Sequence, residues 1–446
     1  MSATPDGKPT EALPWQGNVL ASTDVKEYWY AVSTTAQLTA DRPHPVRVLG
    51  EPLALFRDEK KVARAFADRC PHKNVKLSDG KMNKGTLECF YHGWTFDSTS
   101  GAVTKVPALP SDCQLPKQCV KTFPCIEKND IIWVYPGNPA NADPKKIHSR
   151  PIQTDYKKKG FWRNETVIDL PCDHSYFVEN LMDIAHTPWA HDGCFNHRDD
   201  AVPLKPQFHM TPSGMHGFLE KVLNNGNPNS LEFEWTAPCT NEVIVRKTGH
   251  KDCIHLFFYS LPTAPGQMRH INITYMNILW FLQYIPRTLL PASQSDLAVI
   301  HGDTVAMMSQ ARNMKEGCPH ITVATPSDEM AIKYRKWYSK AFGSSSDGEK
   351  GGPWWKGWDG KLDLEDLATS AMETCLPQFS RGVYERAAAG TNSSTDSEYI
   401  VEMWKVQQRR RKPLGFEKPS QWSSLSILLG IAVGAAAAVM VMKRNP

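Results

Sequence analysis

The chain has 446 residues, of which 41% are hydrophobic and 22% are charged. This composition is close to that of ordinary globular proteins and excludes a mainly disordered, collagen-like or coiled-coil chain. A net charge of +4 gives little basis for nucleic-acid binding, which requires a strongly basic domain. The 11 Cys are expected to be reduced thiols or metal ligands, because the chain has no secretory signal that would favour disulfides.

The length suits two domains with appendages. We expect a flexible N-terminus over residues 1–24. This segment resembles neither a secretory signal nor an organellar transit peptide. Short β-rich runs follow, and they predict a small all-β domain over 25–140. These runs lie at 28–32, 46–49, 53–56 and 133–135. The stretch 136–159 is rich in Gly, Asn, Pro and Lys and is interpreted as a linker or exposed loop.

Residues 141–342 predict a second domain in which strands and helices are mixed. Strands are expected at 242–247 and 255–259. A helix start is marked by Thr325 as N-cap, Pro326 at the first position and Asp328 closing a capping box. A Gly- and Ser-rich linker then opens a C-terminal region over 343–423.

The end of the chain contains 18 residues without a charge, LSILLGIAVGAAAAVMVM at 425–442. As a helix this segment would be about 27 Å long, close to the roughly 30 Å thickness of a bilayer's hydrocarbon core. Basic residues flank it on both sides and are more numerous upstream. We therefore expect a single-pass membrane anchor over 424–442, with the body of the protein on the cytosolic or stromal-equivalent face. A buried core helix is the alternative.

The most specific motif is Cys-Pro-His at 70–72, followed after 16 residues by Cys-Phe-Tyr-His-Gly-Trp at 89–94. Structural zinc sites usually pair Cys with Cys and His with His. Here each turn supplies one of each, Cys70 with His72 and Cys89 with His92. That pattern is typical of a Rieske [2Fe–2S] cluster, in which two thiolates hold one iron and two imidazoles hold the other. Zinc is the alternative ion.

A second group of polar residues lies at Asn180, Asp183, His186 and His191. On a helix, Asp183 and His186 would lie on one side, because they are three residues apart. A break at Pro188 would let the chain bend so that the two imidazoles converge. Two His require one carboxylate to form the facial triad of non-haem Fe(II).

The third ligand must come from far along the chain. Asp303 is the favoured candidate and Asp296 is the alternative; either could instead be a solvated carboxylate on a helix. A further Cys-Pro-His at 318–320 lacks a matching second half and is interpreted as structural. The chain has no Gly-rich dinucleotide fingerprint after a strand, so electrons are expected from a separate protein.

In these motifs the chain resembles the oxygenase component of Rieske non-haem iron oxygenases, over about residues 25–345. Within that family it is similar to the branch of pheophorbide a oxygenase, chlorophyllide a oxygenase and the translocon-associated Rieske protein of the chloroplast envelope. The matching pieces are 119–123 with 131–134, 179–183, 262–266 and the hydrophobic C-terminus. Unlike pheophorbide-type members, the chain contains no C-x-x-C, so no thioredoxin-regulated dithiol is expected.

The resemblance implies an α+β fold: a small all-β Rieske domain followed by a mixed, helix-grip-like catalytic domain, with a C-terminal transmembrane helix. It implies one [2Fe–2S] cluster per subunit, held by Cys70, His72, Cys89 and His92. It also implies a mononuclear non-haem Fe(II), held by His186, His191 and Asp303. Asn180 and Asp183 are the candidate catalytic residues, with Asp183 as the bridge between one subunit's cluster and the next subunit's iron in a head-to-tail homotrimer.

The implied function is oxygenation of a lipophilic small molecule at a membrane, with O₂ and with electrons from a ferredoxin or ferredoxin reductase. A chlorophyll-derived tetrapyrrole is the first guess for the substrate, and a plastid membrane, thylakoid or envelope, is the implied location. The alternatives are an oxygenase or desaturase of a sterol or other lipophile, and a redox-sensing electron-transfer subunit. Four lysines, at 73, 76, 81 and 84, could form a basic rim for an acidic ferredoxin or belong to a solvated loop.

Overall fold

The computed structural model of the chain describes residues 24–277, except 171, 193–195, 225–226, 248–253 and 265. Beyond these it describes 299–300, 303–304, 306–307, 309–310, 313, 318–319 and 321–342. The expected flexible N-terminus up to residue 23, the C-terminal region 343–423, the anchor 424–442 and the alternative ligand Asp296 lie outside the described residues. Within the described parts, no helix is both long and apolar enough to cross a membrane.

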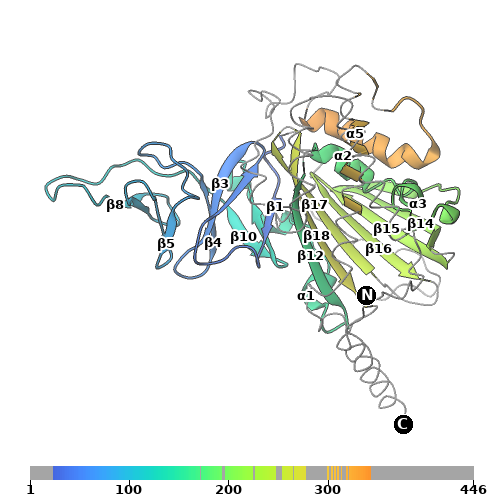
Figure 1. Ribbon diagram of the computed structural model, residues 1–446, viewed down its shortest axis with the longest axis horizontal. Helices are drawn as coiled ribbons and strands as arrows, with labels where there is room; N and C mark the ends of the chain where they lie inside the picture. The colour runs from blue at the N-terminus through green and yellow to red at the C-terminus, as the bar shows by residue number, and fades with distance from the viewer. Residues whose placement is uncertain are drawn as a thin grey trace, which may run out of the picture.

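Three small antiparallel sheets form the N-terminal part of the molecule, coloured blue to cyan in Figure 1. The first has the order β1-β11-β10 and contains β1 (Tyr30–Thr34), β10 (Cys125–Lys128) and β11 (Ile131–Val134). The second has the order β2-β3-β4-β9 and contains β2 (His44–Val48), β3 (Glu51–Arg57), β4 (Ala63–Ala67) and β9 (Thr122–Phe123). The third runs β5-β6-β7-β8, with β5 (Lys81–Asn83), β6 (Thr86–Glu88), β7 (Thr95–Phe96) and β8 (Val103–Lys105). The β-rich runs of the sequence are thus confirmed as β1, β2, β3 and β11.

The connection after these sheets is largely exposed but contains a few buried side chains. It contains two 3₁₀ turns, η2 (Pro139–Asn141) and η3 (Pro144–Lys146), and the short helix α1 (Ile152–Asp155). Ile147 and Ile152 are 3% and 4% exposed and pack in a cluster with Trp133 and Phe257. The indole of Trp29 donates to the carbonyl of Asp143 at 2.9 Å. The expectation of a linker or exposed loop thus holds for most of this stretch, while its few apolar side chains cover a sheet that the sequence alone does not reveal.

A seven-stranded antiparallel sheet forms the second part, in the order β12-β18-β17-β16-β15-β14-β13. Its strands are β12 (Trp162–Leu170), β13 (Gln207–Thr211), β14 (Gly214–Asn224), β15 (Asn227–Thr236), β16 (Thr240–Lys247), β17 (Ile254–Ala264) and β18 (Gln267–Met276). The strands expected at 242–247 and 255–259 are confirmed as β16 and β17. Between β12 and β13 the chain leaves the sheet and forms α2 (His174–Asn180), α3 (Thr187–Ala190) and the 3₁₀ turn η4 (Arg198–Asp200).

Figure 1 shows the helices α2, α3 and α5 on one face of this sheet. The helix start predicted at Thr325 is confirmed, with a 3₁₀ first turn η7 (Pro326–Asp328) that leads into α5 (Glu329–Phe342). Trp235 of β15 contacts Tyr334 and Trp337 of α5, with ring centroids 5.3 and 4.9 Å apart. Arg335 of α5 pairs with Glu179 of α2, which joins the two helices over the sheet.

Alternate residues of the central strands serve two cores, because successive side chains of a strand point to opposite faces. Phe258 of β17 faces the helices, whereas Phe257 and Tyr259 face the other side. There Tyr259 meets Trp133 of β11, with ring centroids 5.4 Å apart. The sheet is therefore buried on both sides, and the described chain is mostly β with few helices.

Candidate cluster loops and candidate iron site

Two loops with the same backbone hydrogen bonds present the four residues of the first motif. In each, the amide of the Cys donates to the carbonyl five residues later, at 2.9 Å for both Cys70 and Cys89. The carbonyl of each Cys accepts from the amide four residues later, at 2.8 and 3.0 Å. That fourth residue has a positive φ in both loops, 58° at Asn74 and 70° at Gly93. Asn and Gly are the residues that tolerate this conformation best, so the local sequence favours both turns.

The loops place thiols inside and imidazoles outside. Cys70 and Cys89 are each 1% exposed, whereas His72 and His92 are exposed, with their rings 4.4 Å apart. The ring of His72 also stacks on Trp94, 4.6 Å away and nearly parallel. Burial raises the pKa of the Cys70 thiol to about 11. Two adjoining buried thiols with two neighbouring surface imidazoles fit a [2Fe–2S] cluster whose histidine-bound iron lies at the surface.

The second group begins where α2 ends. The helix expected through Asp183 and His186 is wrong, because α2 stops at Asn180 and the next residues form turns. Asp183 Oδ1 accepts a hydrogen bond from the amide of Ala185 at 2.9 Å. An Asp that binds the backbone two residues later favours a turn over a continued helix. The turn still leaves Asp183 Oδ2 3.7 Å from Nδ1 of His186.

The single-turn helix α3 brings the two histidines together. His186 is its N-cap and His191 is its C-cap. The break expected at Pro188 is also wrong: Pro188 lies within the first two positions of α3, where the missing N–H of a proline costs no helical hydrogen bond. One helical turn between the caps, rather than a kink, makes the imidazoles converge.

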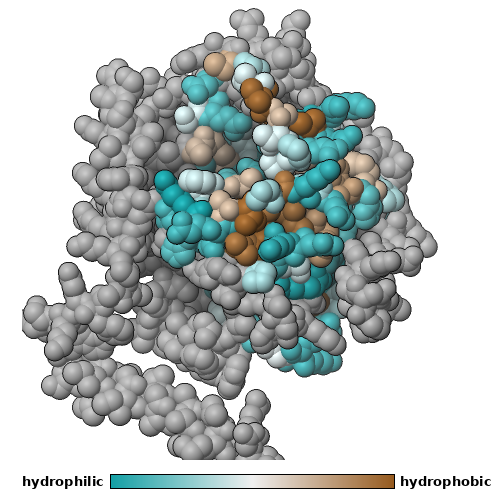
Figure 2. All heavy atoms as spheres, turned by 90° about the vertical axis from the view of Figure 1, so that its right-hand side faces the viewer, coloured by the Kyte–Doolittle hydropathy of each residue, from teal (hydrophilic) through white to brown (hydrophobic). Residues whose placement is uncertain are grey.

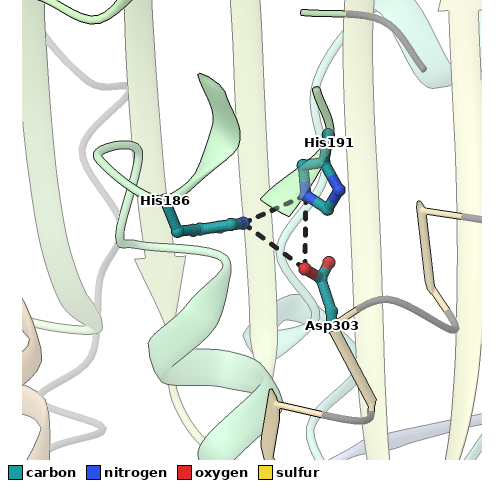
Figure 3. A group of neighbouring side chains, drawn as sticks. All are labelled: His186, His191 and Asp303. Atoms are coloured by element: carbon teal, nitrogen blue, oxygen red, sulfur yellow. Dashed lines mark hydrogen bonds and ion pairs between the residues drawn. The ribbon is translucent and has the colours of Figure 1, made fainter. Parts of the chain in front are cut away.

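Asp303 joins these histidines from more than 100 residues further along the chain. The Nε2 atoms of His186 and His191 are 3.1 Å apart, and Asp303 Oδ1 lies 3.5 Å from the first and 3.2 Å from the second. Figure 3 shows the three side chains pointing toward one another. With metal–ligand bonds of about 2.1 Å, donors at right angles would be about 3.0 Å apart. The triangle is therefore close to one face of an octahedral metal site.

The charges of this triad also suit a metal cation. Burial raises the pKa of Asp303 to about 6, although His186 and a hydrogen bond from Asn180 lower it. Burial, together with His186, lowers the pKa of His191 to about 3, so its imidazole is neutral. Burial lowers the pKa of His186, but its contact with Asp183 and the charge of Asp303 outweigh burial and leave it raised. A divalent cation would balance the negative charge of the Asp303 carboxylate, which is only 5% exposed.

Asn180 and Asp183 contact the same histidine from two sides. The Nδ2 atom of Asn180 lies 3.5 Å from Nε2 of His186, on the side of the triad. Asp183 meets the other ring nitrogen, and its side chain is 35% exposed. Asp183 therefore connects the half-buried imidazole of His186 with the surface.

A second set of potential ligands, which the sequence did not suggest, lies on the opposite face of the sheet. His148, Glu234 and Glu242 have ligand atoms within 4.8 Å of one another. Arg150 donates to Glu234 at 2.6 Å and to Glu242 at 2.8 Å. Because the guanidinium already occupies both carboxylates, this set is an ion-pair network rather than a metal site. In the sequence, only the alternation of Glu with apolar residues in 231–235 could have indicated this set. The same alternation is equally typical of a strand with one solvated face.

The surface around the cluster loops is partly aromatic and partly basic. Phe90 and Tyr91 are 56% and 52% exposed. Of the four lysines between the loops, Lys81 pairs with Glu88 at 3.0 Å and Lys73 lies over the ring of Tyr91. Outside this region, Cys318 is exposed and His320 lies outside the described residues.

Comparisons with known proteins agree with this geometry. Residues 28–124 match the family model described as Rieske [2Fe-2S] domain, and residues 235–319 match that described as Pheophorbide a oxygenase. The chain is 31% identical over 334 residues to Protein TIC 55, chloroplastic, of Pisum sativum, covering 72% of this chain and 59% of the relative. The chain therefore contains a Rieske [2Fe–2S] domain and a segment similar to pheophorbide a oxygenase. It is also 29% identical to Chlorophyllide a oxygenase, chloroplastic, of Chlamydomonas reinhardtii, over 70% of this chain and 48% of the relative.

Among solved structures, this chain is similar to dicamba monooxygenase bound to dicamba. The TM-score is 0.62 at 22% sequence identity, covering 72% of this chain and 98% of the other. At that identity the likeness concerns the fold, which is that of a Rieske-type oxygenase. The chain spans about three fifths of the TIC 55 relative and about half of the chlorophyllide a oxygenase relative.

Proposed function

We propose that this protein is an oxygenase that uses O₂ and electrons from a ferredoxin or ferredoxin reductase to oxidise a lipophilic substrate. The observation that carries the proposal is the convergence of His186, His191 and Asp303 in a chain that also has both cluster loops. An electron-transfer protein has no need of a second group of metal-type donors, whereas an oxygenase requires one.

In this proposal, Cys70, His72, Cys89 and His92 hold the cluster, and His186, His191 and Asp303 hold the iron. Bound there, the cluster would supply single electrons and the ferrous ion would activate O₂. Asp183 keeps His186 in the orientation and tautomer in which Nε2 faces the triad, since a carboxylate on the far nitrogen fixes the ring. Asn180 donates to Asp303 and stabilises its charged form.

Two domains, at 25–140 and 141–342, and a head-to-tail homotrimer are part of the proposal. The sheet of β5–β8 lies at the opposite end of the molecule from α2 and α3 in Figure 1, which supports transfer between subunits rather than within one. Figure 2 shows hydrophobic atoms gathered at the centre of the end that carries α3 and β14, with hydrophilic atoms around them. Trp189 of α3 is 55% exposed there. The exposed Trp189, six residues after Asp183, suits the exposed Phe90 and Tyr91 of a neighbouring subunit's cluster loops.

The substrate class is proposed from the relatives. One is named for chlorophyllide a, and a family model that matches residues 235–319 is named for pheophorbide a. We therefore favour a chlorophyll-derived tetrapyrrole, with a sterol or other lipophile as the alternative. A plastid location is supported by the chloroplastic relatives. Membrane attachment through 424–442 follows from the apolar sequence of that segment.

Metal analysis of the purified full-length chain tests the proposal first. We expect about three iron and two sulfide ions per chain, and the electron paramagnetic resonance signal of a Rieske cluster after reduction. Asp303→Ala should lose one iron and keep the sulfide, whereas His92→Ala should lose the cluster. Zinc in the cluster loops, or no iron in the triad of the wild-type chain, would contradict the proposal and favour another role for the chain.

A substrate screen under ¹⁸O₂ tests the second step. Pheophorbide a, chlorophyllide a and a sterol are incubated with the reduced protein and a ferredoxin, and mass spectrometry follows label in the products. Label in a tetrapyrrole supports the favoured class, and label only in the sterol supports the alternative. Fully loaded protein that labels neither would point to the redox-sensing subunit.

A further inference from the structure

The sheet face beneath α2 carries two buried polar residues that stand side by side. Ser260 of β17 and His270 of β18 are opposite partners across the antiparallel pair. Ser260 is 0% exposed and His270 is 1% exposed. Because strand side chains alternate, both lie on the face of Phe258, which is the face that the helices cover.

Neither side chain is satisfied within the described part of the chain. Ser260 Oγ and His270 Nδ1 are buried and have no hydrogen-bond partner among the described residues. The imidazole of His270 contacts two aromatic rings, with centroids 4.4 Å from Phe177 and 5.7 Å from Phe258. Burial lowers the pKa of His270 to about 3, so the ring is neutral at physiological pH. Buried polar atoms are nearly always paired, and a functional site is where exceptions occur.

The pair is linked to the candidate iron site through Phe177 of α2. Phe177, which packs on His270, is one helical turn before Asn180 in α2. Asn180 in turn lies 3.5 Å from Nε2 of His186. Phe177 also belongs to an apolar cluster with Ile300 and Met307, which flank Asp303 in the sequence. The polar pair therefore adjoins the apolar side chains between the sheet and the triad.

We propose that Ser260 and His270 form a polar subsite that donates hydrogen bonds to an oxygen atom of the lipophilic substrate, a carbonyl or a carboxylate. The proposal rests on the proposed oxygenase function and adds a recognition element to it. Apolar pockets with a few placed polar groups orient their ligands through those groups. The aromatic rings beside His270 suit the face of a ring system, and the two donors would hold it in one orientation relative to the triad.

The first experiment needs no substrate. In the ligand-free protein, His270→Phe and Ser260→Ala should leave the melting temperature unchanged or raise it, because each removes an unsatisfied buried polar atom. The control is Thr274→Val on the same face of β18, since the hydroxyl of Thr274 already donates to Asn272 at 3.3 Å. That variant should lower the melting temperature. If His270→Phe lowers it as much as Thr274→Val, then His270 is paired at rest and the subsite is refuted.

The second experiment measures binding of pheophorbide a by the change in its absorbance under anaerobic conditions, and then KM and kcat. His270→Phe should weaken binding and raise KM by about tenfold, the size of one lost hydrogen bond. His270→Asn should restore most of the affinity, because its amide nitrogen comes near the position of Nδ1. Thr274→Val should bind as the wild type does. Unchanged affinity in His270→Phe would refute the subsite.

The two proposals fail in different ways. If the wild-type protein binds neither pheophorbide a nor chlorophyllide a, the tetrapyrrole assignment fails, and the same variants are titrated with the sterol. If the wild type binds neither tetrapyrrole nor the sterol, the melting temperatures still test the subsite. A lower melting temperature in His270→Phe refutes the subsite, and an equal or higher one supports it. If the wild type binds and the variant binds equally well, the subsite alone fails.

Discussion

The ion pair of Arg269 and Asp169 offers a sharp test of how the two parts of the chain are joined. The two residues stand opposite each other on β18 and β12 and are 5% and 6% exposed. Arg269 donates twice to the carboxylate, from Nε at 2.7 Å and from Nη2 at 2.9 Å. Its Nη1 donates to the carbonyl of Val32 at 3.3 Å, where the pairing of β1 with β11 is irregular. One guanidinium thus holds the seven-stranded sheet to the N-terminal part.

Arg269→Met should lower the free energy of unfolding by about 3–5 kcal/mol, because Asp169 would stay buried without its cation. The double variant Asp169→Leu with Arg269→Met should recover most of that loss, since replacing both charges of a buried pair with apolar groups is often neutral or better. About 1 kcal/mol should remain lost from the hydrogen bond to Val32. The double-mutant cycle should therefore give a coupling energy of at least about 2 kcal/mol.

Urea unfolding of the full-length chain, followed by circular dichroism and by the visible absorbance of the cluster, measures these differences. The matched control is Arg198→Met, which breaks an ion pair with Asp192 at 3.1 Å in which Arg198 is 54% exposed. An exposed pair of this kind should contribute less than about 1 kcal/mol. The reasoning would be refuted if Arg269→Met cost no more than the control, or if the double variant lost the sum of both single losses.

Three further predictions concern the two metal sites and the response to pH. Asp183→Asn should keep iron and sulfide at wild-type levels and lower turnover by about 10–100-fold; equal turnover would remove Asp183 from the electron path. Gly93→Ala should reduce cluster loading, since it places a side chain at a φ of 70° with Pro107 at 3.0 Å, whereas Asn74→Gly should load normally. Burial and then two arginines lower the pKa of His44 to about 3. The unfolded chain takes up this proton near pH 6.5, so stability should fall as the pH drops below 6.5. In thermal melts at pH 5.5, the free energy of unfolding of His44→Leu should fall by about 1.4 kcal/mol less than that of the wild type. If both proteins lose the same amount of stability, other groups cause the loss.

The candidate site was largely predictable because its motifs are local. Cys70 with His72, and Cys89 with His92, are each close enough in sequence for one turn to present both side chains. Local chemistry also explains why two predictions were wrong, namely the helix through Asp183 and the break at Pro188. An Asp that accepts from the amide two residues later ends a helix, and Pro188 is compatible with a first turn, so the site is a turn followed by α3.

Long-range features were less accessible. The sequence favoured Asp303 but kept Asp296 as the alternative, because no local pattern pairs either carboxylate with histidines more than 100 residues away. The stretch 136–159 is mostly exposed as expected, but the sequence could not show that Ile147 packs against the far face of the sheet. The pairing of Arg150 with Glu234 and Glu242 joins residues that are 84 and 92 positions apart.

The amino-acid sequence by itself determined the donor types, the two cluster loops and the strands of the N-terminal part, because these depend on residue identity and on spacings of a few positions. Only the tertiary structure decided which carboxylate meets His186 and His191, and that Ser260 stands beside His270 under α2. The physical reason is the antiparallel pairing of long strands. That pairing, and the packing of helices on the sheet, set distances between residues that no local pattern relates.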